Sequence, residues 1–200
     1  MTRRLSAIAG LTLVAGLLVP ATASAQAFGA KGGLTFARIV HQPSEDYRIS
    51  SSADPGLVGG AFVTLLESKP FSIQADGVVA LRKVDFGVSV QKITSFDVPV
   101  VARYRVLTSG AWVVRAAGGV TSTMVFRAEE TTPGGEPFDV KEAFEPFILS
   151  AVVGGQAEWK KRWLFEGRFM FGLTEVDSEP IPGFTSRLRG FEVTAGYRFW

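Results

Sequence analysis

Hydrophobic and polar residues alternate along most of this chain with a period of two, the period of a β-strand. The segment 191–200 is the clearest case. One face of this segment carries Phe191, Val193, Ala195, Tyr197 and Phe199, and the other carries Glu192, Thr194, Gly196 and Arg198. Because successive side chains of a strand point to opposite sides, the segment predicts a ribbon with one apolar and one polar face.

Eight segments of this kind can be counted along the chain. They span 28–37, 57–66, 71–82, 96–106, 112–126, 147–159, 163–174 and 191–200. The segment 57–66 is apolar on both faces, so the pattern does not assign its sides. Segments of about ten alternating residues separated by turns are typical of membrane barrels. We therefore predict an all-β fold, an eight-stranded antiparallel up-and-down transmembrane β-barrel.

The connections between these segments alternate in length. Short turns are expected at 67–69, 107–110 and 160–162, and long connections at 41–56, 83–94, 127–145 and 175–187. Outer membrane barrels have short periplasmic turns and longer outer loops. The pattern thus predicts that both termini lie on the periplasmic side.

Aromatic residues gather beside the predicted short turns. Amphipathic rings favour the headgroup level of a bilayer, so these residues predict a membrane-interface girdle. Its members are Phe71, Tyr104, Trp112, Trp159, Trp163, Tyr197, Phe199 and Trp200. A second, outer girdle could be formed by Phe96, Phe126, Phe147, Phe171 and Phe191.

The polar faces carry charges of both signs, which we expect to form a network inside the barrel. The set is Lys31, Asp76, Arg82, Asp97, Arg103, Arg105, Arg115, Glu158, Glu166, Arg168, Glu192 and Arg198. An eight-stranded barrel is just wide enough for side chains to fill it, and buried ions need partners. We therefore expect the arginines at 103, 105, 115, 168 and 198 to bond the carboxylates at 76, 97, 158, 166 and 192. The alternative is a charged path for ions or substrates.

A soluble barrel of lipocalin type would show the same alternation with the apolar face turned inward. Such a protein would be a periplasmic or secreted binder of small apolar ligands. The aromatic girdle, the alternating loop lengths and the mid-strand position of both charge signs favour the membrane barrel.

The first 25 residues are typical of a signal peptide that is cleaved after export. Arg3 and Arg4 precede an apolar run from Leu5 to Val19, and Ala23-Ser24-Ala25 forms a small-residue cleavage site. The run of about fifteen apolar residues is shorter than the roughly twenty of a membrane-spanning anchor, the alternative reading. The expected mature domain is 26–200. Its 19 basic and 19 acidic residues give no reason to propose nucleic acid.

The sequence offers little support for catalysis. It has no Cys and one His, His41, at the start of a predicted outer loop. We expect no enzymatic activity, no cofactor and no metal site, because neither a nucleophile–base pair nor metal-ligand spacing is visible. A lipid-modifying barrel enzyme that uses His41 is the less favoured alternative. Mid-strand glycines such as Gly118, Gly119, Gly154 and Gly155 are expected to reflect tight curvature of the wall.

Four runs resemble a known family: Ser95-Phe-Asp-Val-Pro-Val-Val-Ala-Arg-Tyr-Arg105, Phe28-Gly-Ala-Lys-Gly-Gly-Leu-Thr-Phe36, Phe71-Ser-Ile-Gln-Ala-Asp76 and Gly196-Tyr-Arg-Phe199. Together they resemble the PorT-type small outer membrane β-barrel family, which is similar in architecture to the OmpX group. The chain departs from the family pattern in having Asp97 and Asp76 where Glu is usual, and in having Trp200 after the terminal Phe. Part of that family is associated with protein secretion, a role that transfers to no residue here.

These observations predict a porin-like outer membrane protein of a diderm bacterium, with a side-chain-filled, salt-bridged interior. It would act through its outer loops, in adhesion or partner binding, or as a structural component of the membrane. The expected partners are outer membrane lipids, lipopolysaccharide and the barrel-assembly machinery, which would read the C-terminal strand. The extracellular partner is not named by the sequence.

Overall fold

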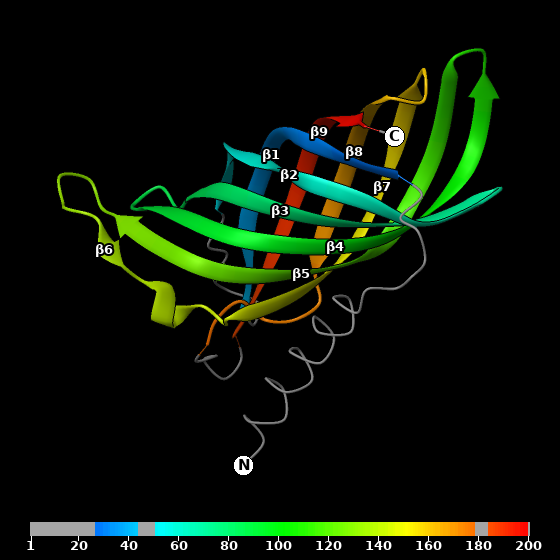
Figure 1. Ribbon diagram of the computed structural model, residues 1–200. Coiled ribbons are helices and arrows are strands. Elements are labelled where there is room, and N and C mark those ends of the chain that lie inside the picture. The colour runs from blue at the N-terminus through cyan, green and yellow to red at the C-terminus, as the bar shows by residue number, and fades with distance from the viewer. Residues whose placement is uncertain (1–26, 44–50, 179–183, 200) are drawn as a thin grey trace.

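The chain folds into a closed antiparallel β-barrel (Figure 1). The computed structural model describes residues 27–43, 51–178 and 184–199, so the expected signal segment 1–25, Gln26 and Trp200 lie outside the described residues. The strands are β1 (Ala27–Pro43), β2 (Ser52–Ser68), β3 (Phe71–Asp85), β4 (Val90–Ser109), β5 (Trp112–Thr131), β6 (Phe138–Asp139), β7 (Phe147–Trp159), β8 (Trp163–Gly172) and β9 (Phe184–Arg198). A short 3-10 helix, η1 (Lys141–Ala143), precedes β7.

Eight of these strands form the wall, and each pairs with its neighbour along the chain. The first and last strands close the ring, because β1 pairs with β9 from Gly29 opposite Arg198 to Pro43 opposite Phe184. The two-residue strand β6 lies outside the ring and pairs only with Glu129 and Glu130 of β5. The predicted eight-stranded antiparallel up-and-down barrel is confirmed.

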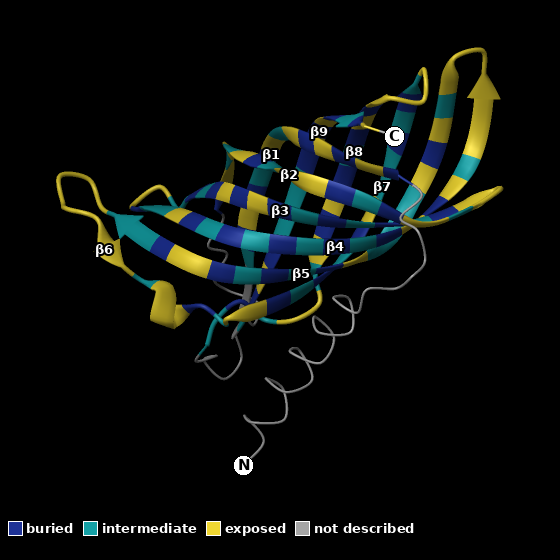
Figure 2. Ribbon diagram, viewed as in Figure 1, coloured by how far each residue is buried: buried dark blue, intermediate teal, exposed yellow. Residues whose placement is uncertain are grey.

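Buried and exposed residues alternate along each strand of the wall (Figure 2). Large apolar side chains such as Phe28, Val79 and Phe169 face outward and are exposed, whereas polar side chains such as Thr35, Gln74 and Glu192 are buried inside. A lipocalin-type barrel would have the opposite arrangement. The soluble alternative is therefore wrong, because an apolar exterior of this extent needs a hydrocarbon solvent.

The structure shows which residues of β2 face the interior, a question that the sequence pattern left open. Val58, Phe62 and Thr64 point inward and are buried. The register with β3 then shifts between Thr64 and Leu66, and both Leu65 and Leu66 are exposed. The bulge adds one residue and breaks the period of two. The inward residues Val58 and Phe62 are themselves apolar, which is why the sequence pattern left the sides of this strand open.

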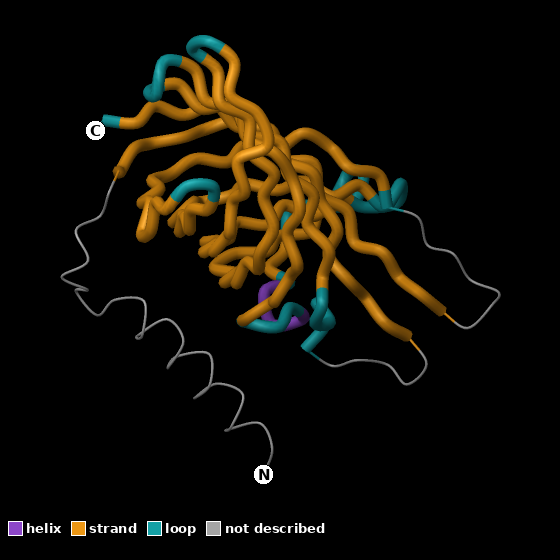
Figure 3. Tube along the Cα trace, turned by 90° about the vertical axis from the view of Figure 1, so that its right-hand side faces the viewer, coloured by secondary structure: helices purple, strands orange, loops and turns teal. Residues whose placement is uncertain are grey.

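The turns expected to be short are short: β2 ends at Ser68 and β3 begins at Phe71, β4 and β5 are separated by 110–111, and β7 and β8 by 160–162. These turns gather at one end of the barrel with the C-terminal end of β9, and the longer connections and η1 lie at the other end (Figure 3).

The connection between β3 and β4 was expected to be long but is short. The predicted loop 83–94 is mostly strand, since β3 runs to Asp85 and β4 begins at Val90. Similarly, His41 lies within β1, opposite Ser186, and not at the start of a loop. The ladder hydrogen bonds continue past the apolar band, where polar pairs such as Lys83 with Asp54 replace lipid-facing side chains.

The outer end of the barrel interior is apolar, which the sequence analysis missed. We call the cluster that fills it the outer plug: Ala37, Ile39, Val84, Ile93, Val125, Ala128, Phe144, Ile148, Val176 and Leu188. Its strand members occupy the inward positions beyond the charged residues, and Phe144 and Val176 come from the connections that follow β6 and β8. The interior is thus charged in the middle and apolar beneath the outer connections.

No helix among the residues that the structure describes is long and apolar enough to cross a membrane.

Glycine allows adjacent strands to bend sharply at two of the four expected positions. A Cβ atom on Gly119 would lie 2.1 Å from the carbonyl oxygen of Val100, and one on Gly154 would lie 2.2 Å from that of Gly167. Such contacts are impossible without moving backbone. Their neighbours Gly118 and Gly155 have room for a Cβ, the nearest atoms being 3.9 and 3.5 Å away. Curvature therefore requires glycine at only one residue of each pair.

Replacing Gly119 by alanine should destabilise the barrel by about 1–3 kcal/mol, because the new methyl group forces β4 and β5 apart. The matched change Gly118→Ala adds the same methyl group at an ordinary van der Waals distance, 3.9 Å from the carbonyl oxygen of Val152, and should stay within about 0.5 kcal/mol of the parent. Urea unfolding in lipid vesicles, followed by tryptophan fluorescence, measures both. Equal stability of the two variants would contradict the steric explanation.

Candidate functional site

The barrel interior holds eleven of the twelve charged residues expected there, contributed by seven of the eight wall strands. The exception is Arg105. It lies near the tight-turn end of β4, is only half-buried, and makes no ion pair with a described residue. The expected bond between Arg105 and a carboxylate is therefore not found among the described residues, although its Nε atom is buried.

Asp76 is the acceptor around which the middle of the interior is arranged. Lys31 donates to its Oδ2 atom, as does Nη1 of Arg168 at 3.0 Å. Its Oδ1 atom accepts a hydrogen bond of 2.6 Å from Nε2 of Gln74. Lys31 also lies 3.2 Å from Glu166. One carboxylate thus joins β1, β3 and β8.

Arg168 connects this group to a second one, formed by Glu192 on the neighbouring strand β9 and by Arg82 and Asp97 on β3 and β4. Its Nε atom donates to Oε2 of Glu192 at 2.9 Å. The other oxygen of Glu192 lies 3.3 Å from Nη2 of Arg82, which also donates to Asp97. Charges of alternating sign therefore run without interruption across the lumen from Asp97 to Glu166. We call this chain of ion pairs the central ladder; it contains Asp97, Arg82, Glu192, Arg168, Asp76, Lys31 and Glu166.

A separate group lies nearer the tight turns. Oε2 of Glu158 accepts hydrogen bonds from Arg115 at 2.8 Å and from Arg198 at 2.9 Å. A carboxylate that was not expected in the network, Glu67 of β2, lies 3.8 Å from Arg115. Glu67 sits in a segment read as a turn, which is why its inward reach was missed.

Arg103 differs from its predicted role. It bonds no carboxylate; it donates to Oε1 of Gln74, to Oε1 of Gln156 at 3.0 Å and to Oγ1 of Thr64 at 3.2 Å. Gln74 in turn donates to Asp76, so Arg103 is joined to the central ladder through an amide. Both glutamines occupy the polar face in the sequence. The signal was present, but a search limited to charged residues did not use it.

The expected girdle residues lie around the tight-turn end of the wall. Seven of them are described, and Trp200 lies outside the described residues. Rings on neighbouring strands contact one another, with centroids 5.1 Å apart for Phe71 and Tyr104, 5.1 Å for Trp163 and Tyr197, and 6.2 Å for Trp112 and Trp159. The contacts couple adjacent strands where amphipathic side chains would meet a headgroup layer.

This arrangement can hold strands together and can block passage, but its charges are occupied with one another. In the described part of the chain, no three His, Asp or Glu side chains are grouped in a way that could hold a metal ion. Six buried cations face five buried acids, and Glu67 at the rim supplies a sixth. Every buried cation except Arg103 is bonded to an acid, and Arg103 is bonded to two glutamines and a threonine; this is the form in which buried charge is tolerated.

Replacing Asp76 by asparagine should destabilise the folded barrel by about 3–5 kcal/mol, because Lys31 and Arg168 then lose a shared buried counter-ion. The matched control is Asp54→Asn, which breaks the exposed pair with Lys83 and should cost less than about 1 kcal/mol. Urea midpoints in vesicles compare the two. Similar losses at the two sites would contradict a structural role for the central ladder.

The chain is similar to Ail of Yersinia pestis, at 11% identity over 86% of this chain and 98% of that one, with a TM-score of 0.47. It is similar to OprG of Pseudomonas aeruginosa, at 11% identity over 86% and 95%, with a TM-score of 0.47. It is also similar to Neisserial surface protein A, at 12% identity over 86% and 95%, with a TM-score of 0.49.

No curated protein matches the sequence. The family described as outer membrane protein beta-barrel domain matches residues 22–178, well over half of the chain. The match spans seven of the eight wall strands. The chain therefore belongs to the outer membrane protein beta-barrel domain family.

Proposed function

We propose that this outer membrane barrel is closed to solutes, has no enzymatic activity, and acts through its outer connections in adhesion or partner binding, or as a structural component of the membrane. The observation that carries the proposal is the filled interior. The central ladder spans the lumen, and the outer plug fills the space beneath the outer connections. With an interior of this kind, the surfaces left for other molecules are the outer connections and the wall.

The proposal also covers the export of the protein and its insertion into the outer membrane. Residues 1–25 would direct export and be removed, and the barrel-assembly machinery would recognise the C-terminal strand. The tight turns would then face the periplasm and the longer connections the outside. A narrower kinship with PorT-type barrels, on the resemblance of the strand motifs, is part of the same proposal.

The connection between β5 and β7 is the strongest candidate for partner contact. Residues 132–139 are all exposed, and the paired ends of β5 and β6 carry them away from the wall (Figure 1). This segment includes Glu136 and Asp139, which follow Glu129 and Glu130 at the end of β5. An acidic projection of this kind suits a partner with a basic surface.

In planar bilayers, the purified barrel should show no steady large conductance, because the ladder and the plug leave no continuous water path. In cells, it should fractionate with the outer membrane and migrate differently on a gel when unboiled. A steady open conductance would reject the closed barrel. Soluble fractionation with no heat-modifiability would reject the membrane barrel itself.

Replacing residues 133–136 by Gly-Ser-Gly-Ser should leave heat-modifiability unchanged, because this segment contributes nothing to the wall. If the outer connections mediate adhesion, a non-adherent host strain expressing this variant should lose the adherence to protein-coated surfaces that the parent barrel confers. The control replaces Val88, in the 86–89 turn, by Ser. Equal adherence of parent and loop variant would contradict a role for this loop.

A further inference from the structure

Two arginines face each other on the outer wall of the barrel, where strands usually avoid like charges. Arg38 of β1 and Arg189 of β9 are directly opposite in register. Both lie on the outward face of the wall, two residues beyond Phe36 and Phe191 respectively, where the apolar band ends. Like charges directly opposite each other destabilise a strand pair. A counter-ion from outside the chain would remove this cost.

The chain supplies no such counter-ion among its described residues. Neither Arg38 nor Arg189 makes an ion pair or a side-chain hydrogen bond there. Basic residues at the same level on the other side of the barrel behave differently: Lys83 is 2.5 Å from Asp54, and Arg127 is 2.5 Å from Glu129. On that side Lys92 makes no ion pair with a described residue, but it lies opposite Glu129 in register. Arg38 and Arg189 differ in having no acid opposite them, since Arg189 faces Arg38 and Phe171, and β1 has no partner in β2 beyond Phe36.

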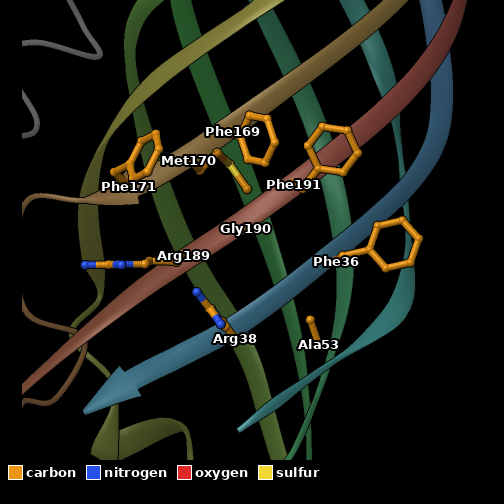
Figure 4. A pocket seen from close by; sticks show the side chains of 9 residues that line it. All are labelled: Phe36, Arg38, Ala53, Phe169, Met170, Phe171, Arg189, Gly190 and Phe191. Carbon is orange, nitrogen blue, oxygen red and sulfur yellow. The ribbon is translucent and has the colours of Figure 1, made fainter. Parts of the chain in front are cut away.

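A groove of about 520 Å³ lies beside the two arginines and is otherwise apolar. Its walls include the rings of Phe36, Phe169, Phe171 and Phe191, and Gly190 lies between them (Figure 4). In the same view, Arg38 points from β1 toward β9. Cationic groups thus border one end of a hydrophobic trough that runs down the lipid-facing wall.

This combination matches one kind of molecule. A guanidinium group offers a planar fork of donors that fits phosphate, and two such groups together fit a phosphate ester better than one. An apolar groove below them fits an acyl chain. Free phosphate has no apolar part to contact the phenylalanines, and an unphosphorylated lipid would leave the arginines without a counter-ion.

We propose that Arg38, Arg189 and the adjoining groove form a binding site for a phosphate-bearing lipid of the outer leaflet, of the lipid A class. The phosphate accepts hydrogen bonds from the two guanidinium groups, and an acyl chain lies against Phe36 and Phe191. The exposed Arg187, one outward position further along β9, extends the basic surface toward the sugar headgroup. The site rests on the proposed orientation, in which this end of the barrel faces outward.

The test is a titration of the full-length processed barrel in detergent micelles with lipid A, followed by native mass spectrometry. The double variant Arg38→Gln/Arg189→Gln should weaken binding about tenfold, the expected result of losing charge-assisted hydrogen bonds to phosphate. The control double variant Lys83→Gln/Arg127→Gln removes the same charge from paired positions and should change binding by no more than about twofold.

Two further binding measurements identify which part of the lipid the site recognises. Lipid A stripped of its phosphates should bind the parent about as weakly as phosphorylated lipid A binds the Arg38/Arg189 variant. Inorganic phosphate at millimolar concentration should not displace phosphorylated lipid A. Equal losses in both double variants, no loss in the Arg38/Arg189 variant, or displacement by inorganic phosphate would each overturn the site.

Heat-modifiability and outer membrane fractionation of the same variants keep this result separate from the proposed function. If all variants are folded and inserted but none discriminates phosphorylated lipid, the lipid site fails while the barrel proposal stands. If the parent itself is not inserted, the barrel proposal fails first.

Discussion

The structure depends on charges that bond one another where water cannot reach them. Arg168 is the residue that makes this a single network, because it joins Glu192 on one neighbouring strand to Asp76 on the facing wall. Removing Asp76 would take one shared counter-ion from both Lys31 and Arg168, a far greater cost than the loss of one pair at the surface. The interior is therefore a polar core, and it does for this barrel what an apolar core does for a soluble domain.

This inversion governs the rest of the molecule. Since the inside is polar, apolar side chains are free to cover the outside, and the wall meets lipid with rings and branched chains. Beyond the lipid band the requirement reverses again. The strands continue outward, their inward positions become the apolar plug, and their outward positions become polar, with charges of both signs. One barrel thus carries two opposite core types along its axis, each matched to the solvent around it.

Much of this could be read from the sequence, because a period of two converts directly into inside and outside. The strands follow from parity, and the burial of residues such as Asp76 and Glu192 follows from parity together with the alternating connection lengths and the aromatic girdle, which identify the polar face as the inner one. Pairing partners do not, since they depend on strand stagger around the ring. Arg103 illustrates this limit, because its neighbours at that level are Gln74 and Gln156. The plug was missed for another reason: Ile39 and Leu188 keep the parity of the polar face but are apolar, so the pattern seemed to have ended.

The outer end of β2 has a consequence for how the wall can open. Pairing of β1 with β2 stops at Phe36 opposite Pro55, while β1 continues along β9 to Pro43. Past that point, the hydroxyl group of Ser51 takes the place of a strand partner, accepting from the amide of Ile39 and donating to its carbonyl oxygen. Among the described residues, the outer ends of the first two strands are thus joined by the Ser51 side chain alone, whereas β1 and β9 remain paired from Gly29 to Pro43. We therefore expect local opening of the wall to begin between the outer ends of β1 and β2 and not between β1 and β9.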